Sequence, residues 1–382
     1  MMKDRINVLY ICHDRVLMAG AVYSLINLME ATKTVVNPIV LIRKGVVKDE
    51  LQSRGYECIT FPYQLNLRRK IKSPYIRHVR QILDDVINIV CVYYTKFMLK
   101  NRNVAIVHSN SSSVSIGPMI AKKLGAKHVW HIREFLDLDF GTSPSKGWQN
   151  LYDFIYKADY VIAITNAVFE HWHLERCIRS KVLYNAVRSI NDVQLVESKE
   201  KYFLFCSTSL NDYKGADFAV TLFCKSCLYK EGYRLKLIGR YEREYKNKLD
   251  IIAMNYQQDP FIDYLGFQDD IKQYMLKASA LLMCSLNEAM GRVTVEALFY
   301  GCPVLGHNTG GTKEILIDGE NGYLYNNIDE ALTKLRRIVE CPQETSRIIR
   351  NGIESAKNNF SKEFYGDKIL EIYNCTLNEY EK

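Results

Sequence analysis

The chain has 382 residues, of which 48% are apolar and 25% charged, and its formal net charge is +8. This length is sufficient for two or three domains, and the composition is typical of a globular protein. No apolar run approaches the ~18 residues of a membrane-spanning helix, and the N-terminus has no signal-peptide pattern. The 11 cysteines, mostly within apolar runs, favour reduced core thiols over a disulfide framework. We therefore expect a cytoplasmic protein.

In the first half of the chain, short apolar runs alternate with longer amphipathic stretches, which is typical of βα units around a parallel sheet. The apolar runs predict strands at residues 6–12, 38–43, 58–61, 105–109, 128–132, 160–165 and 182–184. Helical patterns lie between them, for example at residues 21–32, 74–100 and 112–124.

The second half repeats this alternation after a polar stretch, residues 188–200, that we interpret as a linker. Strands are expected at residues 202–207, 234–238, 261–265, 280–284 and 303–305, with helices at 214–230, 269–277, 293–300 and 329–340. The fold class predicted is α/β, with two Rossmann-like, doubly wound domains at residues 1–187 and 201–360. We expect residues 361–382 to form a helix that packs back on the first domain. The two domains would face each other across a cleft, and ligands would bind there, beyond the carboxyl ends of the strands.

The stretch from Ser285 to Glu314 reads SLNEAMGRVTVEALFYGCPVLGHNTGGTKE. It places Glu288 and Glu296 on either side of Gly291, where we expect a helix to begin. The unpaired N–H groups at the start of a helix bind phosphate. Because carboxylates repel phosphate, these glutamates are better suited to accept hydrogen bonds from sugar hydroxyls. Glu296 would lie about 7.5 Å along the helix axis, roughly the distance from a diphosphate to its ribose. The stretch therefore predicts a nucleotide-sugar site.

A second stretch, from Leu67 to Leu83, is basic and contains no acidic residue. Its cations are Arg68, Arg69, Lys70, Lys72, Arg77 and Arg80. Two interpretations stay open: a solvated face, or a surface that contacts anionic membrane headgroups or an acceptor carrying phosphate. Nucleic acid is not expected as a partner, because no aromatic platform or known reading motif accompanies these cations.

With these residues identified, the chain resembles a family-4 retaining glycosyltransferase of GT-B architecture over nearly its whole length. The densest match is an E-x(7)-E phrase, from Glu288 to Glu296, followed in the family's order by G-C-P-V-L, T-G-G-T-K-E and D-G-E-N-G-Y-L-Y. The resemblance implies transfer of a hexose or N-acetylhexosamine from a nucleotide diphosphate sugar, with UDP favoured. It implies retention at the anomeric carbon and a lipid-linked or oligosaccharide acceptor, in cell-surface polysaccharide or glycolipid synthesis. It further implies no metal or other cofactor. The basic stretch would bring this cytoplasmic enzyme to the inner face of the membrane, if it contacts headgroups there.

The resemblance also implies roles for individual residues. Lys214 would stabilise the diphosphate, Glu288 would hold donor-sugar hydroxyls and His131 would lie near the anomeric carbon, and these three form the expected catalytic group. Glu296 would hold the ribose. The other expected donor-binding residues are Gly20, Gly266, Phe267, Gly291, Arg292 and Val293. The first domain would bind the acceptor, with His13 and Arg133 on that side.

One position departs from the family's pattern. An arginine is usual about five residues before the expected diphosphate lysine, and here Ser209 stands in its place. A serine cannot form the bidentate, charged hydrogen bonds that a guanidinium forms with a diphosphate. Arg292 or Arg240 could form them in place of the missing arginine. Two alternatives therefore stay open beside the transferase: a non-catalytic partner subunit of glycosyltransferase type, and a GT-B nucleotide-sugar epimerase.

Overall fold

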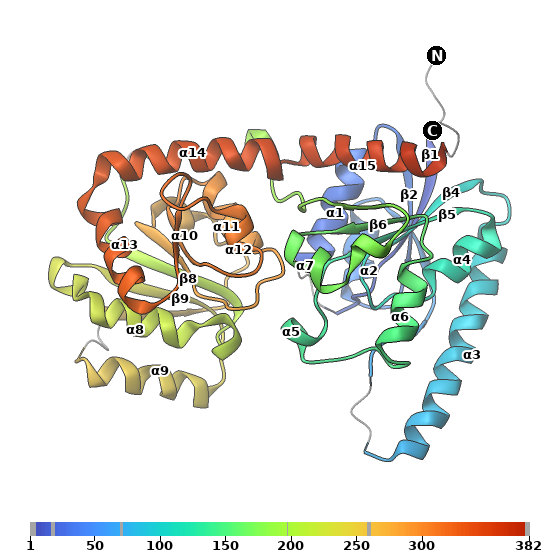
Figure 1. Cartoon of the computed structure of the whole chain (residues 1–382), viewed down its shortest axis with the longest axis horizontal. Helices are drawn as coiled ribbons and strands as arrows, with labels where there is room; N and C mark the ends of the chain where they lie inside the picture. The colour runs from blue at the N-terminus through green and yellow to red at the C-terminus, as the bar shows by residue number, and fades with distance from the viewer. Residues whose placement is uncertain (1–4, 17–19, 69–71, 197, 258–260, 379–382) are drawn as a thin grey trace. The chain divides into compact units, whose positions relative to one another are not determined.

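The structure is a computed structural model that describes residues 5–16, 20–68, 72–196, 198–257 and 261–378 (Figure 1). Its contacts divide the chain into two compact units. Unit 1 comprises residues 1–186 together with 362–382, and unit 2 comprises residues 187–361. Residues 188–200, which the sequence led us to interpret as a linker, belong to unit 2.

Unit 1 is built on a seven-stranded parallel sheet in the order β3-β2-β1-β4-β5-β6-β7. The strands are β1 (Ile6–Ile11), β2 (Val36–Ile42), β3 (Glu57–Thr60), β4 (Val104–Ser109), β5 (Lys127–Ile132), β6 (Tyr160–Ala163) and β7 (Ser180–Val182). The strand order reverses between β1 and β4, which marks the topological switch point of a doubly wound sheet.

The helices of unit 1 connect these strands and cover the sheet. They are α1 (Gly20–Thr32), α2 (Val46–Ser53), α3 (Pro74–Met98), α4 (Gly117–Leu124), α5 (Asp137–Phe140), α6 (Trp148–Ile155), α7 (Asn166–His171) and α15 (Lys362–Leu377). The last of these packs on α1, where the ammonium of Lys362 lies 2.6 Å from the carboxylate of Glu30. The same helix reaches the sheet through Tyr373, whose hydroxyl lies 2.8 Å from Nδ1 of His108.

Unit 2 repeats this topology with a six-stranded parallel sheet in the order β10-β9-β8-β11-β12-β13. Its strands are β8 (Tyr202–Ser209), β9 (Arg234–Arg240), β10 (Ile262–Gly266), β11 (Ala280–Met283), β12 (Val304–His307) and β13 (Tyr323–Tyr325). Its helices are α8 (Ala216–Ser226), α9 (Arg243–Asn255), α10 (Lys272–Lys277), α11 (Arg292–Phe299), α12 (Thr312–Ile315), α13 (Ile328–Glu340) and α14 (Pro342–Phe360). The prediction of two doubly wound α/β domains is confirmed.

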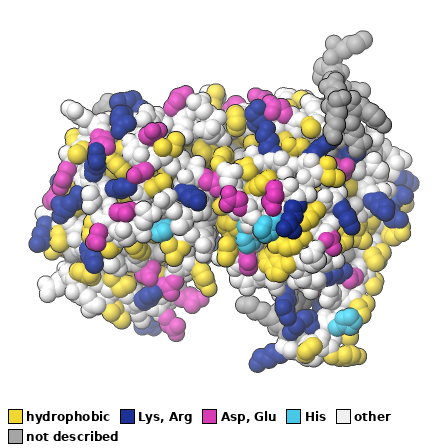
Figure 2. Space-filling model, viewed as in Figure 1, with side chains coloured by type: hydrophobic (Ala, Val, Ile, Leu, Met, Phe, Trp, Pro, Cys, Tyr) yellow, Lys and Arg dark blue, Asp and Glu magenta, His cyan; other side chains and the backbone are white. Residues whose placement is uncertain are grey.

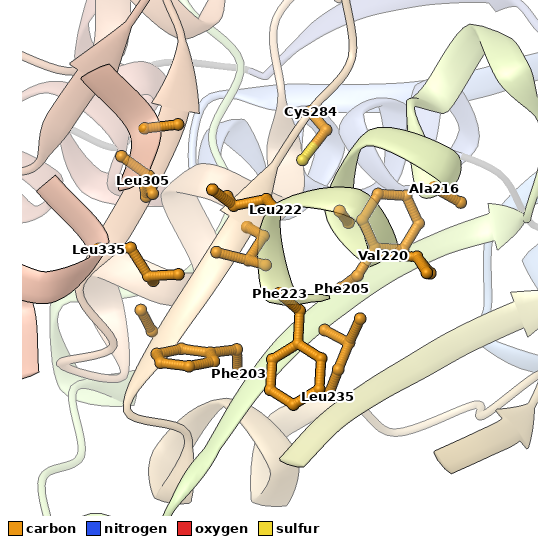
Figure 3. Packing of buried hydrophobic residues seen from close by; sticks show 14 of the residues in the cluster. Phe203, Phe205, Ala216, Val220, Leu222, Phe223, Leu235, Cys284, Leu305 and Leu335 are labelled. Atoms are coloured by element: carbon orange, nitrogen blue, oxygen red, sulfur yellow. The ribbon is translucent and has the colours of Figure 1, made fainter. Parts of the chain in front are cut away.

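The core of unit 2 forms where the apolar face of α8 meets the sheet. Figure 3 shows Phe223 and Val220 of that helix against Phe203 and Phe205 of β8, with Leu235 of β9 beside them. All of these side chains are buried. This packing fixes β8 and α8, and therefore also the turn between them, which carries Lys214.

Candidate functional site

The switch point of unit 2 brings two of the expected catalytic residues into contact. β8 and β11 are neighbours in the sheet, so the segments that follow them leave its carboxyl edge side by side. After β8 the chain makes a 3₁₀ turn, Asp212–Lys214, in which the backbone N–H of Lys214 donates to Oδ1 of Asn211 at 3.0 Å. After β11 comes the loop that carries Glu288. The ammonium of Lys214 lies 2.8 Å from Oε2 of Glu288, so the two side chains form an ion pair.

The loop that carries Glu288 is held by the glycine pair Gly310–Gly311. The N–H of Gly311 donates to the carbonyl oxygen of Glu288 at 2.7 Å. Gly310 has a φ of +52°, and a Cβ at this position would lie 2.6 Å from the same oxygen, so a larger residue would displace the loop. Gly291, with φ of +90°, then turns the chain into α11. The helix begins at Arg292, as the sequence indicated, and the first N–H groups of a helix have no acceptor within it.

Glu296 lies one turn into α11, and two arginines hold it. Its Oε1 accepts from Nη2 of Arg188 and from Nη2 of Arg292, each at 3.3 Å. The guanidinium of Arg188 also lies over the ring of Tyr300, 5.6 Å from its centre. Val293, a neighbour of Arg292 in the first turn of α11, is partly exposed. The sequence analysis missed Arg188, because it belongs to the polar stretch that we interpreted as a linker.

The structure places one of the possible substitutes for the missing arginine beside Ser209. Ser209 ends β8, and its hydroxyl accepts from Nδ2 of Asn211 at 3.1 Å. Arg240 is its partner in register on β9, and the guanidinium of Arg240 lies 4.4 Å from the ring centre of Phe267. Phe267 follows Gly266, the last residue of β10, which has a φ of +67°. The strand next to Ser209 therefore brings a stacked guanidinium to the same edge of the sheet.

In unit 1, His131 and Arg133 lie at the carboxyl end of β5, and both are buried. Arg133 donates through Nε to Oδ1 of Asn110 at 2.8 Å, through Nη1 to Oδ1 of Asn185, and through Nη2 to Nδ1 of His131 at 3.2 Å. None of the contacts among the described residues joins Arg133 to a carboxylate. All three of these acceptors are neutral. The guanidinium of Arg133 is buried within unit 1, where it orients the ring of His131.

The contact with Arg133 determines which ring nitrogen of His131 carries the proton. A guanidinium donates and never accepts, so Nδ1 of His131 must be the acceptor and the ring proton must lie on Nε2. Burial and the nearby Arg133 charge hold the pKa of His131 well below its usual value, so the ring is neutral. Nε2 is buried and has no hydrogen-bond partner among the described residues. His131 is therefore a neutral N–H donor that is suited to an oxygen of a ligand.

The residue after Arg133 is a buried carboxylate that the sequence analysis did not identify. Oε1 of Glu134 accepts from the hydroxyl of Ser111 at 2.6 Å, the N–H of Ser112 at 2.7 Å and the hydroxyl of Ser112 at 2.5 Å. These bonds hold the segment after β4 in a turn, which is why α4 begins at Gly117 and not near Ser112 as predicted. The signal in the sequence was the serine run itself, since serines favour turns over helix interiors.

Two other expected residues lie at the same edge of unit 1. His13 follows β1, and its Nδ1 is buried without a partner among the described residues. Burial lowers the pKa of His13, against the opposing effect of the Glu134 charge. Gly20 is the first residue of α1, and its carbonyl accepts from the hydroxyl of Ser24 at 2.8 Å.

The basic stretch contacts other parts of unit 1. The backbone N–H of Arg68 donates to the carbonyl of Ser143, while Arg77 and Arg80 lie on α3 and Lys72 is exposed just before it. Arg69 and Lys70 lie outside the described residues. Within the described ranges no helix is long and apolar enough to cross a membrane. Those ranges also contain no group of three or more His, Cys, Asp or Glu side chains placed to hold a metal ion.

Comparison with known proteins shows which families and structures the chain is similar to. Residues 187–355, most of unit 2, match the family model described as glycosyl transferases group 1. An uncharacterized glycosyltransferase of Methanocaldococcus jannaschii is 24% identical over 282 residues, which cover 72% of this chain and 75% of that protein. The lipopolysaccharide core biosynthesis glycosyltransferase LpsE of Rhizobium meliloti is 27% identical over 144 residues, covering 37% of this chain and 42% of that protein. The chain thus matches less than half the length of the second relative.

Among solved structures, the Anabaena protein HepE in complex with UDP is similar over the whole fold. The TM-score is 0.79 at 19% sequence identity, and the match covers 97% of this chain and 100% of that one. The same Anabaena protein has also been solved with UDP-glucose. The chain therefore has the fold of the GT-B glycosyltransferases, and the comparisons support a glycosyltransferase of group 1.

Proposed function

We propose that the chain is a retaining glycosyltransferase that moves a hexose or N-acetylhexosamine from a nucleotide diphosphate sugar, with UDP favoured, to a lipid-linked or oligosaccharide acceptor. The observation that carries this proposal is the contact between Lys214 and Glu288 beside the first turn of α11. A cation, a carboxylate and a helix start then meet at the switch point, where open α/β sheets bind ligands.

Each of these groups has a part in the proposed reaction. The negative charge that develops on the departing diphosphate is stabilised by the ammonium of Lys214 and by the first N–H groups of α11. The carboxylate of Glu288 accepts hydrogen bonds from hydroxyls of the donor sugar, and that of Glu296 accepts from the ribose. Phe267 and Gly266, at the end of β10, contact the base.

Unit 1 supplies the proposed contact at the reacting sugar. His131 is neutral and presents Nε2–H, so it donates a hydrogen bond to a sugar oxygen instead of removing a proton. Arg133 acts through His131 and is a positioning residue. His13 lies at the same edge and is assigned to the acceptor side.

Two comparisons support the choice of substrates. The structurally similar HepE has been solved with UDP and with UDP-glucose, which supports a UDP-sugar donor. The relative from Rhizobium meliloti is named for lipopolysaccharide core biosynthesis, which supports an acceptor in surface-polysaccharide or glycolipid synthesis. We further propose that no metal is needed, because Lys214 provides positive charge where the diphosphate leaves.

A ligand panel followed by product analysis tests this proposal. UDP should raise the melting temperature more than GDP or ADP does, because a ligand that binds only the folded state stabilises it. Incubation with UDP-glucose or UDP-N-acetylglucosamine and a lipid-linked acceptor should release UDP, and NMR of the product should show an α-anomeric proton. Activity should survive EDTA.

The alternatives give different results in the same assays. A non-catalytic partner subunit would show no stabilisation by any nucleotide. An epimerase would return an isomerised sugar still attached to its nucleotide, and an inverting transferase would give the β-anomer. Each of these results would overturn the proposal.

A further inference from the structure

Helix α3 exposes a continuous apolar stripe to solvent. Its exposed large apolar side chains include Tyr75, Ile76, Val79, Ile82, Leu83, Val86, Ile89, Val90, Tyr93 and Phe97. These positions follow one another at steps of one, three and four residues, so they lie on one face of the helix. The exposed fraction is 77% at Tyr75 and 64% at Phe97. Monomeric proteins rarely expose such a stripe, and those that do use it for binding.

The stripe is exposed because the buried residues of α3 lie near its C-terminal end, while the turns before them contact unit 1 through polar side chains such as Asp85 and Asn88. The buried residues of the helix are Cys91, Val92 and Thr95, and its N-terminal half has none. Figure 1 shows this half extending beyond the sheet, and Figure 2 shows hydrophobic side chains at the surface of the same region. The helix is nevertheless well terminated, with Pro74 in its first turn and the hydroxyl of Ser73 accepting from the N–H of Ile76. A stable helix therefore presents the apolar face.

Cations border the stripe at both ends. Near the C-terminal end, the ammonium of Lys123 lies 4.8 Å from the ring centre of Tyr93, and that of Lys100 lies 5.0 Å from the ring centre of Phe97. The N-terminal end carries Lys72, exposed just before the helix, together with Arg68, Arg77 and Arg80, which line a cavity at the polar face of α3. Figure 2 shows dark blue side chains near this end.

The acidic residues of α3 do not cancel this charge. Its two carboxylates are Asp84 and Asp85, and each lies near a cation of its own. Asp84 lies 3.8 Å from Arg80, and Asp85 lies 2.7 Å from Lys146 of a neighbouring segment. The apolar stripe therefore has a border that is net positive.

We propose that α3 docks unit 1 on an anionic lipid bilayer, with the apolar stripe in the interfacial layer and the bordering cations among the headgroups. An amphipathic helix with an apolar face and a basic border binds in this way. The aromatic rings near its two ends suit the boundary between headgroups and acyl chains. A second copy of the chain is less favoured as the partner, because the border offers a copy like charges.

The docking is independent of the donor-site assignments, since it involves neither Lys214 nor the glutamates of unit 2. If the acceptor is lipid-linked, the same contact holds the enzyme at the surface where its acceptor lies. The test below uses no nucleotide and no acceptor, so its failure would leave the proposed transfer reaction untouched.

The experiment is flotation of the full chain with vesicles. The protein should float with vesicles of two parts phosphatidylcholine to one part phosphatidylglycerol, and should stay at the bottom of the gradient with phosphatidylcholine alone. Raising the salt concentration should weaken binding to the anionic vesicles. Absence of binding to the anionic vesicles at low salt would overturn the proposal.

Variants separate the two contributions. Val86→Ser with Val90→Ser should lower the partition coefficient about tenfold or more, because apolar area can no longer be buried in the lipid. Arg68→Gln with Lys72→Gln should lower it about 25-fold, at about fivefold for each cation removed. The matched control is Ile251→Ser with Met254→Ser on α9, whose side chains are 60% and 61% exposed and should not contribute. An equal loss in the control would contradict the assignment to α3.

Sedimentation velocity of the same proteins distinguishes the competing occupant. We expect a monomer whose sedimentation does not change with Val86→Ser and Val90→Ser. A dimer that these substitutions dissociate would show that the stripe binds a second copy, and would overturn the proposal.

Discussion

Glu296→Ala tests whether the ion pairs around α11 hold unit 2 together as well as preparing it for a ligand. The side chain of Glu296 is 10% exposed, and one of its oxygens accepts from both Arg188 and Arg292. Removing the carboxylate leaves two guanidinium groups facing the same space with no anion between them. The variant should therefore be destabilised by loss of attraction and by repulsion between the two remaining cations.

The size of the effect follows from the burial of the three groups. Breaking a buried ion pair by removing one partner costs about 3–5 kcal/mol. Here the Arg292 side chain is 19% exposed but that of Arg188 is 35% exposed, so water screens part of the interaction. We therefore expect a loss of about 2–3 kcal/mol in the free energy of opening of unit 2.

Unit 2 also contains a closely matched control. Arg336 and Glu340 on α13 form an ion pair at the same 3.3 Å and with the same four-residue spacing as Arg292 and Glu296, but their side chains are 44% and 57% exposed. Glu340→Ala should cost only about 0.3–0.5 kcal/mol. The two pairs share their spacing and distance, and they differ in burial and in the second arginine, Arg188, that contacts Glu296.

The assay is native-state hydrogen exchange with mass spectrometry, which reports opening free energies peptide by peptide. Tryptophan fluorescence would be a poor probe, because all 3 tryptophans lie in unit 1. Peptides from α11 should exchange faster in Glu296→Ala and should be nearly unchanged in Glu340→Ala. Equal changes in the two variants would refute the reasoning from burial.

Three further outcomes are expected. Lys214→Ala should lower kcat about 100- to 1000-fold in steady-state assays, as loss of an oxyanion donor does, while Lys248→Ala, which removes an exposed ion-paired lysine, should not. Arg133→Met should let the proton of His131 move to Nδ1, which ¹⁵N NMR of labelled rings would detect, whereas Arg133→Lys should retain the Nε2–H form. Burial lowers the pKa of His128 from 6.5 to about 3, so the unfolded chain binds a proton that the folded chain does not. This contribution to stability is complete above pH 6.5 and is lost as the pH falls toward 3, at about 1.4 kcal/mol per unit. Because burial also lowers the pKa values of His13, His108 and His131, the contribution of His128 is the difference between the wild type and His128→Gln in tryptophan-detected urea unfolding at pH 7 and 5.5.

The alternation of apolar and amphipathic segments was sufficient to predict the parallel sheets, because buried parallel strands are apolar on both faces. The same rule failed for β13, whose three residues, Tyr323–Tyr325, follow a glycine-rich turn and are too few to show a pattern. The sequence analysis also gave no helix for residues 342–360, where the structure has α14, and Ser361 in extended conformation separates α14 from α15.

The candidate site was predicted where its chemistry lies within one segment. Gly291 and the two glutamates of E-x(7)-E are close in sequence, and helix geometry relates Gly291 to Glu296, whereas the position of Glu288 depends on the loop that Gly311 holds. Arg188 was missed because its contact with Glu296 spans 108 positions, and no local pattern marks it. The contact between Arg133 and His131 was missed for a different reason, because the direction of a side chain at the end of a strand depends on the neighbouring strands.

Helix α3 shows the same limit on a larger scale. Its amphipathic pattern was visible in the sequence, and so was the basic stretch before it. An apolar stripe is ordinarily interpreted as the face that packs on the core. Only the structure shows that α3 packs through Cys91, Val92 and Thr95 instead, and leaves the stripe in water.

The charges of unit 2 also give a reason why Ser209 is compatible with diphosphate binding. Without ligand, Lys214 pairs with Glu288, while Arg188 and Arg292 pair with Glu296, so three cations face two carboxylates. A diphosphate at the start of α11 competes with the carboxylates for these cations. On the proposed function, the carboxylates that it displaces are then available to sugar and ribose hydroxyls, so phosphate and hydroxyl contacts form together. On the proposed function, the arginines of α11 and of the chain that precedes β8 would then bind the diphosphate in place of the arginine that the resemblance leads one to expect at Ser209.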